Sequence, residues 1–165
     1  MKSNRAFFVT NAAFIAAVYV VLTFVANAFG LASGVIQVRL SEALCILPFF
    51  TPAAIPGLFV GCLLANLITG CCLLDIVFGS LATLIGASLG YLLRKYKYLI
   101  PVPTILANAF IVPFVLIYGY GEPLPYWYLF ATVGAGEVIS AGALGIILLT
   151  ALVNVPSFQS VFFES

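Results

Sequence analysis

Long apolar runs, separated by short stretches that contain glycine, proline or charged residues, dominate this sequence. A helix needs about 20 apolar residues to cross a bilayer, and about six such crossings use nearly the whole chain. The pattern therefore predicts an all-α, polytopic bundle of six transmembrane helices that forms a single membrane domain over residues 1–165. Four of the predicted helices cover residues 6–29, 75–93, 99–118 and 126–153. Between 29 and 75, a short helix begins at 41 and ends at a proline-rich turn at 51–57, and another helix runs from that turn to about 70.

The composition supports lipid as the main solvent of the chain. Hydrophobic residues make up 64% of it and charged residues 7%, whereas a soluble domain carries about 25% charged residues. The net charge of +1 does not indicate a nucleic-acid surface. Histidine is absent and the four cysteines lack zinc-site spacing, so we expect no metal site and no cofactor.

Basic residues predict the topology. Lys2 and Arg5 precede the first apolar run, and Arg94, Lys95 and Lys97 follow the fourth. Both clusters fall on the same side of the membrane in a six-helix map, which the positive-inside rule assigns to the cytoplasm. We therefore expect a multi-pass protein of the cell membrane with cytoplasmic N- and C-termini. The first run is too long for a cleavable signal and is interpreted as a membrane helix.

The same map places most acids on the outer side. Arg39, Glu42, Asp75 and Glu122 fall at the outer ends of helices, and Glu137 lies deep within the last apolar run. Because a charge within the membrane is costly, it usually marks a binding site. Arg39, Glu42, Asp75 and Glu137 are candidate substrate-binding residues. The structural alternatives are ion pairs with Arg39 and, for Asp75, a favourable helix start.

Three further side chains are candidates for contact with a ligand. Asn66 and Asn108 are amides inside apolar helices, where they either bridge helices or bind substrate. Trp127 lies among tyrosines near the outer ends of the last two helices. This aromatic group is typical of a membrane interface, and the sharper hypothesis is a stacking surface for a planar ligand.

Small residues on the first helix predict a contact face. Ala12 and Ala16, and likewise Ala13 and Ala17, are spaced four apart, which lets another helix approach closely. Two glycine pairs with the same spacing, Gly57 with Gly61 and Gly86 with Gly90, favour close helix contacts within the bundle.

The sequence lacks the motifs of several catalytic classes. It contains no Gly-x-x-x-x-Gly-Lys-Ser/Thr phosphate loop, no histidine and no Gly-x-Ser-x-Gly nucleophile motif. We therefore expect neither an ATPase nor an intramembrane hydrolase, and we predict that the chain is not an enzyme. A capture protein that takes its energy from another subunit fits this pattern.

Three segments resemble a known family. They are VRLSEAL at 38–44, LPFFTPAAIPGLFVGC at 47–62 and DIVFGSLAT at 75–83. They are similar to the QueT family of queuosine-precursor transporters, which are substrate-capture (S) components of energy-coupling-factor (ECF) transporters. The resemblance implies a six-helix S-component fold. It also implies as partners one transmembrane coupling protein, which the alanines of the first helix would face, and two cytoplasmic ATPases.

The implied substrate is a 7-deazaguanine precursor of queuosine, such as the aminomethyl base or queuine. The pairing edge of this base presents two adjacent N–H groups, and one carboxylate can accept both. Acidic side chains would also attract the cationic amine of the base. We hypothesise that Glu137 reads this edge, that Glu42 or Asp75 holds the amine, and that Arg39 orients a carboxylate or meets the ring oxygen. The alternatives are an S component for another vitamin, a stand-alone small oligomeric transporter and an intramembrane enzyme.

Overall fold

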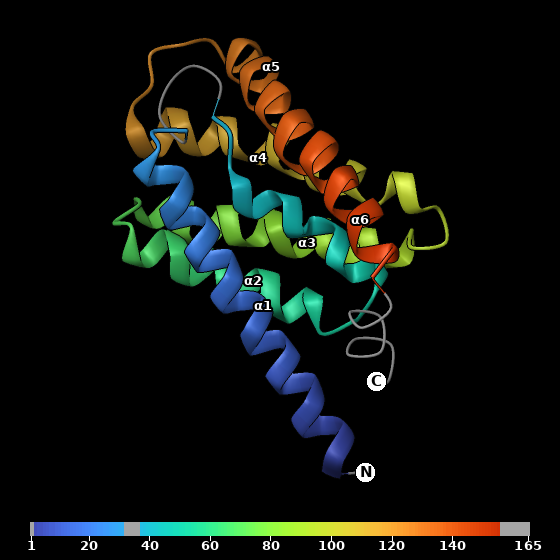
Figure 1. The fold of residues 1–165 in the computed structure, drawn as a ribbon. Helices are drawn as coiled ribbons and strands as arrows, with labels where there is room; N and C mark the ends of the chain where they lie inside the picture. Colours follow the sequence, from blue (N-terminus) through green and yellow to red (C-terminus); the bar gives the residue numbers. More distant parts are fainter. Residues whose placement is uncertain (1, 32–36, 156–165) are drawn as a thin grey trace.

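The computed structural model describes residues 2–31 and 37–155, and the regular elements in this part of the chain are all helical (Figure 1). In chain order they are α1 (Lys2–Ala28), η1 (Leu40–Phe49), α2 (Ala54–Ile68), η2 (Asp75–Gly79), α3 (Ser80–Leu92), η3 (Lys97–Leu99), α4 (Pro101–Tyr120), α5 (Tyr126–Glu137), η4 (Val138–Leu144) and α6 (Gly145–Val153). Helix η2 runs directly into α3, and α5 runs through η4 into α6. The C-terminal tail, 156–165, lies outside the described residues.

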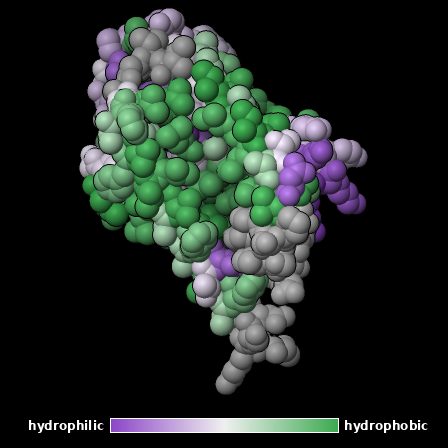
Figure 2. Space-filling view, in the orientation of Figure 1, coloured by the Kyte–Doolittle hydropathy of each residue, from purple (hydrophilic) through white to green (hydrophobic). Residues whose placement is uncertain are grey.

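Four helical stretches of the described chain are long and apolar enough to cross a membrane. They are Arg5–Ala28, Asp75–Leu92, Lys97–Tyr120 and Tyr126–Val153, and two shorter apolar helices, η1 and α2, accompany them. Figure 2 shows apolar side chains over most of the visible face, as expected where lipid is the solvent. These features confirm the predicted polytopic, all-helical membrane protein.

The second predicted helix, η1, is a 3₁₀ helix. Its ten residues span about 20 Å at the 3₁₀ rise of about 2.0 Å per residue. Every side chain from Ser41 to Pro48 is buried, and η1 contacts α1, α3 and α6. A short, proline-containing segment therefore runs through the interior of the bundle, where helices on several sides enclose it.

Helices α1 and α2 contact each other through small residues, and this contact divides the four alanines of the predicted partner face. Gly57 lies against the backbone of Ala12, and Gly61 lies against Ala16. Ala16 is buried, whereas Ala13 and Ala17 are exposed. In this structure Ala12 and Ala16 contribute to internal packing, and Ala13 and Ala17 remain accessible.

Gly61→Ala is expected to destabilise the protein, because a Cβ there would lie 2.7 Å from Cβ of Tyr19. Overpacking of this kind costs about 1–3 kcal/mol. Gly134→Ala is the matched control, since its Cβ would meet only Cβ of Ala109, at 3.7 Å. Thermal unfolding in detergent should show a lower melting temperature for Gly61→Ala and no loss for Gly134→Ala. Equal melting temperatures would contradict the tight α1–α2 contact.

The segments alternate in direction, so their ends gather at two poles of the bundle. The C-terminal ends of α1, α2 and α4 lie at the same pole as the starts of η1, η2 and α5 (Figure 1). The α3–α4 connection, which carries Arg94, Lys95 and Lys97, lies at the other pole. The first pole is therefore where the candidate residues Arg39 and Asp75 can meet.

Candidate functional site

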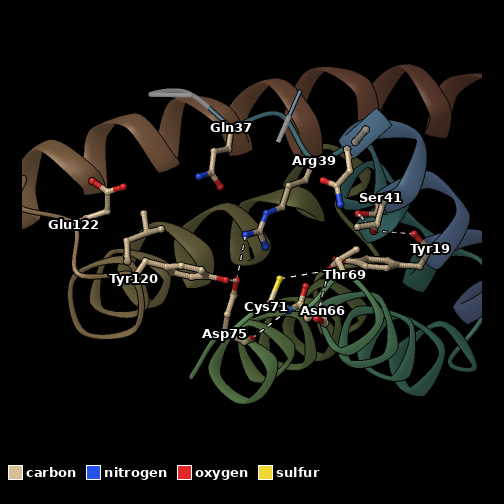
Figure 3. Close-up of a pocket in the computed structure, with 14 residues that line it drawn as sticks. Tyr19, Gln37, Arg39, Ser41, Asn66, Thr69, Cys71, Asp75, Tyr120 and Glu122 are labelled. Atoms are coloured by element: carbon tan, nitrogen blue, oxygen red, sulfur yellow. Dashed lines mark hydrogen bonds and ion pairs between the residues drawn. The ribbon is translucent and has the colours of Figure 1, made fainter. Parts of the chain in front are cut away.

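A polar pocket of about 270 Å³ opens at this first pole. Helix α1, the segment before η1, the end of α2, the start of η2 and the end of α4 all contribute to its wall (Figure 3). The polar side chains that line it are Tyr19, Thr23, Asn27, Gln37, Arg39, Ser41, Asn66, Thr69, Asp75, Tyr120 and Glu122. Residues that are far apart in the sequence thus share one cavity.

Arg39 and Asp75 face each other across the pocket. Nη2 of Arg39 lies 4.0 Å from Oδ2 of Asp75, a separation at the outer limit of an ion pair. The same oxygen accepts a hydrogen bond of 3.0 Å from the Tyr120 hydroxyl. The Asp75 side chain is 4% exposed and that of Arg39 is 22% exposed. The Arg39 guanidinium and the Asp75 carboxylate therefore lie next to each other, but they are too far apart to form a close hydrogen bond.

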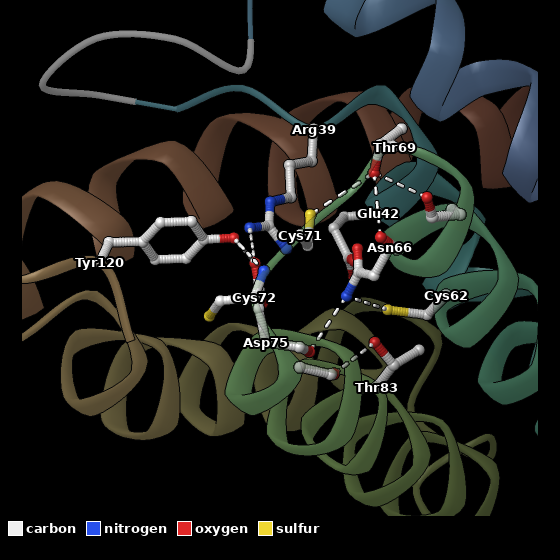
Figure 4. Close-up of polar contacts among 12 residues, drawn as sticks. Arg39, Glu42, Cys62, Asn66, Thr69, Cys71, Cys72, Asp75, Thr83 and Tyr120 are labelled. Carbon is white, nitrogen blue, oxygen red and sulfur yellow. Dashed lines mark hydrogen bonds and ion pairs between the residues drawn. The ribbon is translucent and has the colours of Figure 1, made fainter. Parts of the chain in front are cut away.

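The start of η2 is fixed by α2 and α4. The Asn66 side chain donates from Nδ2 to the backbone oxygen of Asp75 at 3.1 Å (Figure 4). The backbone N–H of Cys72 donates to the Tyr120 hydroxyl at 3.3 Å. Asn66 therefore acts on Asp75 through the backbone, and the π-helical turn at Asp75–Gly79 holds this carboxylate at the pocket wall. Such turns are frequent at functional sites.

The segment that carries Arg39 is fixed to the long C-terminal helix. The backbone N–H of Arg39 donates to Oγ of Ser140 at 3.0 Å. Gly136 lies so close to the backbone oxygen of Gln37 that a side chain there would clash. Burial alone would lower the pKa of Arg39, but nearby groups, Asp75 foremost, outweigh this and raise the pKa above its ordinary value. The guanidinium therefore stays charged at any physiological pH.

A buried polar layer adjoins the pocket. Glu42, Asn108 and Glu137 are each at most 5% exposed, and the Tyr19 hydroxyl donates to Oε1 of Glu42. Within the described residues, Oε2 of Glu137 and Nδ2 of Asn108 have no hydrogen-bond partner. A small cavity of about 10 Å³ between Arg39 and Glu137 is about the size that holds one water molecule.

The structure sorts the predicted site residues into three groups. Arg39, Asn66 and Asp75 line the pocket together. Glu42 and Asn108 lie in the buried layer, and Glu137 reaches only the small cavity beside Arg39.

Trp127 is not among the residues that line this pocket, and its contact with a ligand stays a prediction. Its side chain is 70% exposed and meets Tyr126 and Phe130 edge-on. An exposed aromatic cluster at a helix end is typical of the membrane interface.

Sequence reasoning missed several residues of the pocket wall. Tyr19, Thr23 and Gln37 carry no signal of their own, because a single polar residue in an apolar helix also occurs at structural positions. Tyr120 is one of the tyrosines near the outer helix ends that the sequence assigns to the membrane interface, yet its hydroxyl contacts Asp75. The alternation of segments between the two poles was the one signal that could have brought Tyr19 and Tyr120 together.

The arrangement is suited to binding. The wall offers donors and acceptors around a space of small-molecule size, and the described residues contain no cluster of His, Cys, Asp or Glu that could hold a metal ion.

Comparisons with known proteins place the chain among transporters. The sequence model of the QueT transporter family matches residues 9–154. The chain is also similar to the protein named queuosine precursor transporter QueT of Lactococcus lactis subsp. cremoris (strain MG1363). The two are 34% identical over 93 residues, which cover 56% of this chain and 54% of that protein. The matched segment thus spans about half of the curated relative. No solved structure matches.

Proposed function

The chain belongs to the QueT transporter family, and on that premise we propose that it is the S component of an ECF importer that captures a queuosine precursor. The ligand is a 7-deazaguanine base that carries an aminomethyl group, taken up from outside the cell. The observation that carries this proposal is the Arg39–Asp75 pair in the wall of a pocket of about 270 Å³.

The pair matches the pairing edge of a guanine-like base. That edge presents a carbonyl oxygen beside two N–H donors. The Arg39 guanidinium can donate to the oxygen while the Asp75 carboxylate accepts from the N–H groups. At a separation of 4.0 Å, Arg39 and Asp75 do not saturate each other's hydrogen-bonding groups. Since Glu137 reaches only the small cavity beyond Arg39, we assign the pairing edge to Asp75.

The excess of carboxylates favours a cationic ligand. Arg39 is the one base among the described residues that line the pocket, whereas Asp75 and Glu122 are both acids. Glu42 and Glu137 add two carboxyls in the adjoining layer. The aminomethyl group is cationic near neutral pH, so the local field attracts it. Glu122 lies across the pocket from Asn66 (Figure 3), and we assign the contact with the amine to its carboxylate.

The proposed partners are one transmembrane coupling protein and two cytoplasmic ATPases. Ala13 and Ala17 are exposed on α1 and offer a small-residue face for the coupling protein. The basic pole with Arg94, Lys95 and Lys97 faces the cytoplasm in this proposal, which directs the pocket outward. Toppling of the whole bundle in the membrane, driven by the ATPases, then releases the ligand inward.

A direct binding measurement tests the proposal. Isothermal titration of the purified chain in lipid nanodiscs with 7-aminomethyl-7-deazaguanine is expected to give saturable, one-site binding. Guanine lacks the amine and should bind at least about tenfold more weakly, which corresponds to about 1.4 kcal/mol. Tighter binding of a panel vitamin such as riboflavin or thiamine would instead favour an S component for another vitamin. Uptake by the chain alone in liposomes would favour a stand-alone transporter.

A further inference from the structure

The segment 37–39, which brings Arg39 to the pocket, lies against the junction of α5 and η4. The backbone N–H of Arg39 donates to Oγ of Ser140 at 3.0 Å. About one helical turn earlier in the same continuous helix, Gly136 lies against the backbone oxygen of Gln37. Both ends of this short segment therefore contact one stretch of helix, although neither Gly136 nor Ser140 is among the residues that line the pocket.

Gly136 allows the segment to lie this close to the helix. Glycine is less favourable than alanine inside a helix, so its place in α5 needs a reason. A Cβ at Gly136 would clash with the backbone oxygen of Gln37, whereas a Cβ at Gly134 would meet only Cβ of Ala109, at 3.7 Å. The close approach of the two backbones at Gly136 therefore depends on the absence of a side chain there.

Ser140 connects this helix to the backbone of Arg39. It lies in the π-helical segment η4 and is fully buried. A serine inside a helix often donates to a carbonyl of the preceding turn, as the Ser80 hydroxyl does to the backbone oxygen of Ile76 at 2.6 Å. The Ser140 oxygen accepts from the backbone of a residue 101 positions earlier in the chain. Its contact therefore joins two distant parts of the sequence.

The backbone of Arg39 is held on both sides. Its N–H donates to Ser140, and its carbonyl oxygen accepts from the backbone N–H of Glu42 at 3.0 Å. Between these contacts the Arg39 backbone is extended, with φ of −101° and ψ of 101°. From this position the Arg39 side chain extends toward Asp75 (Figure 3). Loss of the Ser140 contact would release the backbone on one side and allow the guanidinium to move.

Resting on the proposed function, we infer that Ser140 is a positioning residue for ligand binding. Ser140 does not contact the ligand. It fixes the backbone of Arg39, and the guanidinium is then placed to donate to the ring oxygen of the base. Gly136 permits this contact because it admits the segment 37–39 against the helix. The affinity for the ring oxygen is therefore set in part by the C-terminal helix, outside the pocket wall.

Titration with two ligands tests this inference. The purified chain in nanodiscs is titrated with 7-aminomethyl-7-deazaguanine and with its 6-thioxo analogue, which keeps the N–H donors of the pairing edge but presents sulfur, a weak acceptor, in place of the ring oxygen. Ser140→Ala is expected to weaken binding of the oxygen base about 3–10-fold, while the affinity for the sulfur analogue stays within about twofold. The preference for oxygen over sulfur should therefore fall.

Ser80→Ala is the matched control for Ser140→Ala. Ser80 is equally buried, and its hydroxyl donates to backbone oxygens of its own helix. Its loss should leave the ratio of the two affinities within about twofold of the parent. Thermal unfolding of each unliganded variant shows whether it is folded.

Gly136→Ala is a second variant that acts on the same segment. Its Cβ would displace Gln37, so binding of the oxygen base should weaken at least about tenfold, and the preference for oxygen over sulfur should fall again. Gly134→Ala, in the same helix, should change neither affinity.

Three outcomes would contradict the inference. If Ser140→Ala weakens both ligands alike, Ser140 has only a general structural role, and the inference is overturned while the proposed function stands. The same conclusion follows if Ser140→Ala binds the oxygen base as tightly as the parent. If the parent binds neither ligand, the proposed function fails, and the inference that rests on it fails as well.

Discussion

Asp75→Asn is expected to weaken binding of 7-aminomethyl-7-deazaguanine by at least about 100-fold. The carboxylate can accept two N–H groups of the ligand, whereas an amide accepts with one atom and presents a donor to a donor with the other. A hydrogen bond to a charged group contributes about 1.5–3 kcal/mol, so the loss of two corresponds to about 3 kcal/mol or more. At about 1.4 kcal/mol per tenfold change in affinity, this exceeds 100-fold.

The tyrosines near Asp75 provide a matched comparison for this prediction. Tyr120 donates to Oδ2 of Asp75 at 3.0 Å, whereas Tyr118 is 74% exposed and lines a separate apolar groove. Tyr120→Phe should weaken binding by about 3–10-fold, and Tyr118→Phe should leave it unchanged. Isothermal titration measures the affinities, and thermal unfolding of each unliganded variant checks the fold. If the folded Asp75→Asn variant binds the ligand as tightly as the parent, Asp75 does not accept hydrogen bonds from the pairing edge of the base.

Helix positions could be predicted from the sequence because each segment carries its own apolar run. The long helices around Tyr126–Val153 and Asp75–Leu92 lie close to their predicted ranges. The 3₁₀ form of η1 was not predictable, because it depends on enclosure by other helices, which a local pattern does not encode. The same applies to the π-turns at Asp75 and after Glu137, whose sequences also suit an ordinary helix.

The site was predictable only where a side chain is costly in lipid. Arg39 and Asp75 stand out as charges in an apolar chain, and both line the pocket. Glu137 stands out for the same reason, yet it lies beyond Arg39 in the buried layer. The free-energy cost of a charged side chain in the membrane indicates that the charge needs partners or a ligand. This cost does not indicate on which side of Arg39 the charge lies. That distinction comes from three-dimensional packing, in particular from the contact of Gly136 with the backbone of Gln37.

Arg39→Gln is expected to destabilise the protein strongly, because it leaves several buried carboxyls without a cation. Removal of one partner from a buried ion pair costs about 3–5 kcal/mol. Asp75 lies 4.0 Å from Arg39, and Glu137 shares the small cavity with it. We expect a large fall in melting temperature in detergent, together with loss of ligand binding. Arg94→Gln, at an exposed base near the opposite pole, should leave both unchanged.

The double variant Arg39→Gln with Glu137→Gln separates the two roles of Arg39. If Arg39 compensates the charge of Glu137, the neutral glutamine at 137 removes part of the uncompensated charge, and the melting temperature should rise above that of Arg39→Gln alone. Ligand binding should remain lost, because the donor to the ring oxygen is still absent. The interaction energy follows from a double-mutant cycle over the four proteins. If the effects of the two substitutions on unfolding free energy are strictly additive, Arg39 does not compensate the charge of Glu137. If the double variant recovers ligand binding, Arg39 contributes to the site only through stability.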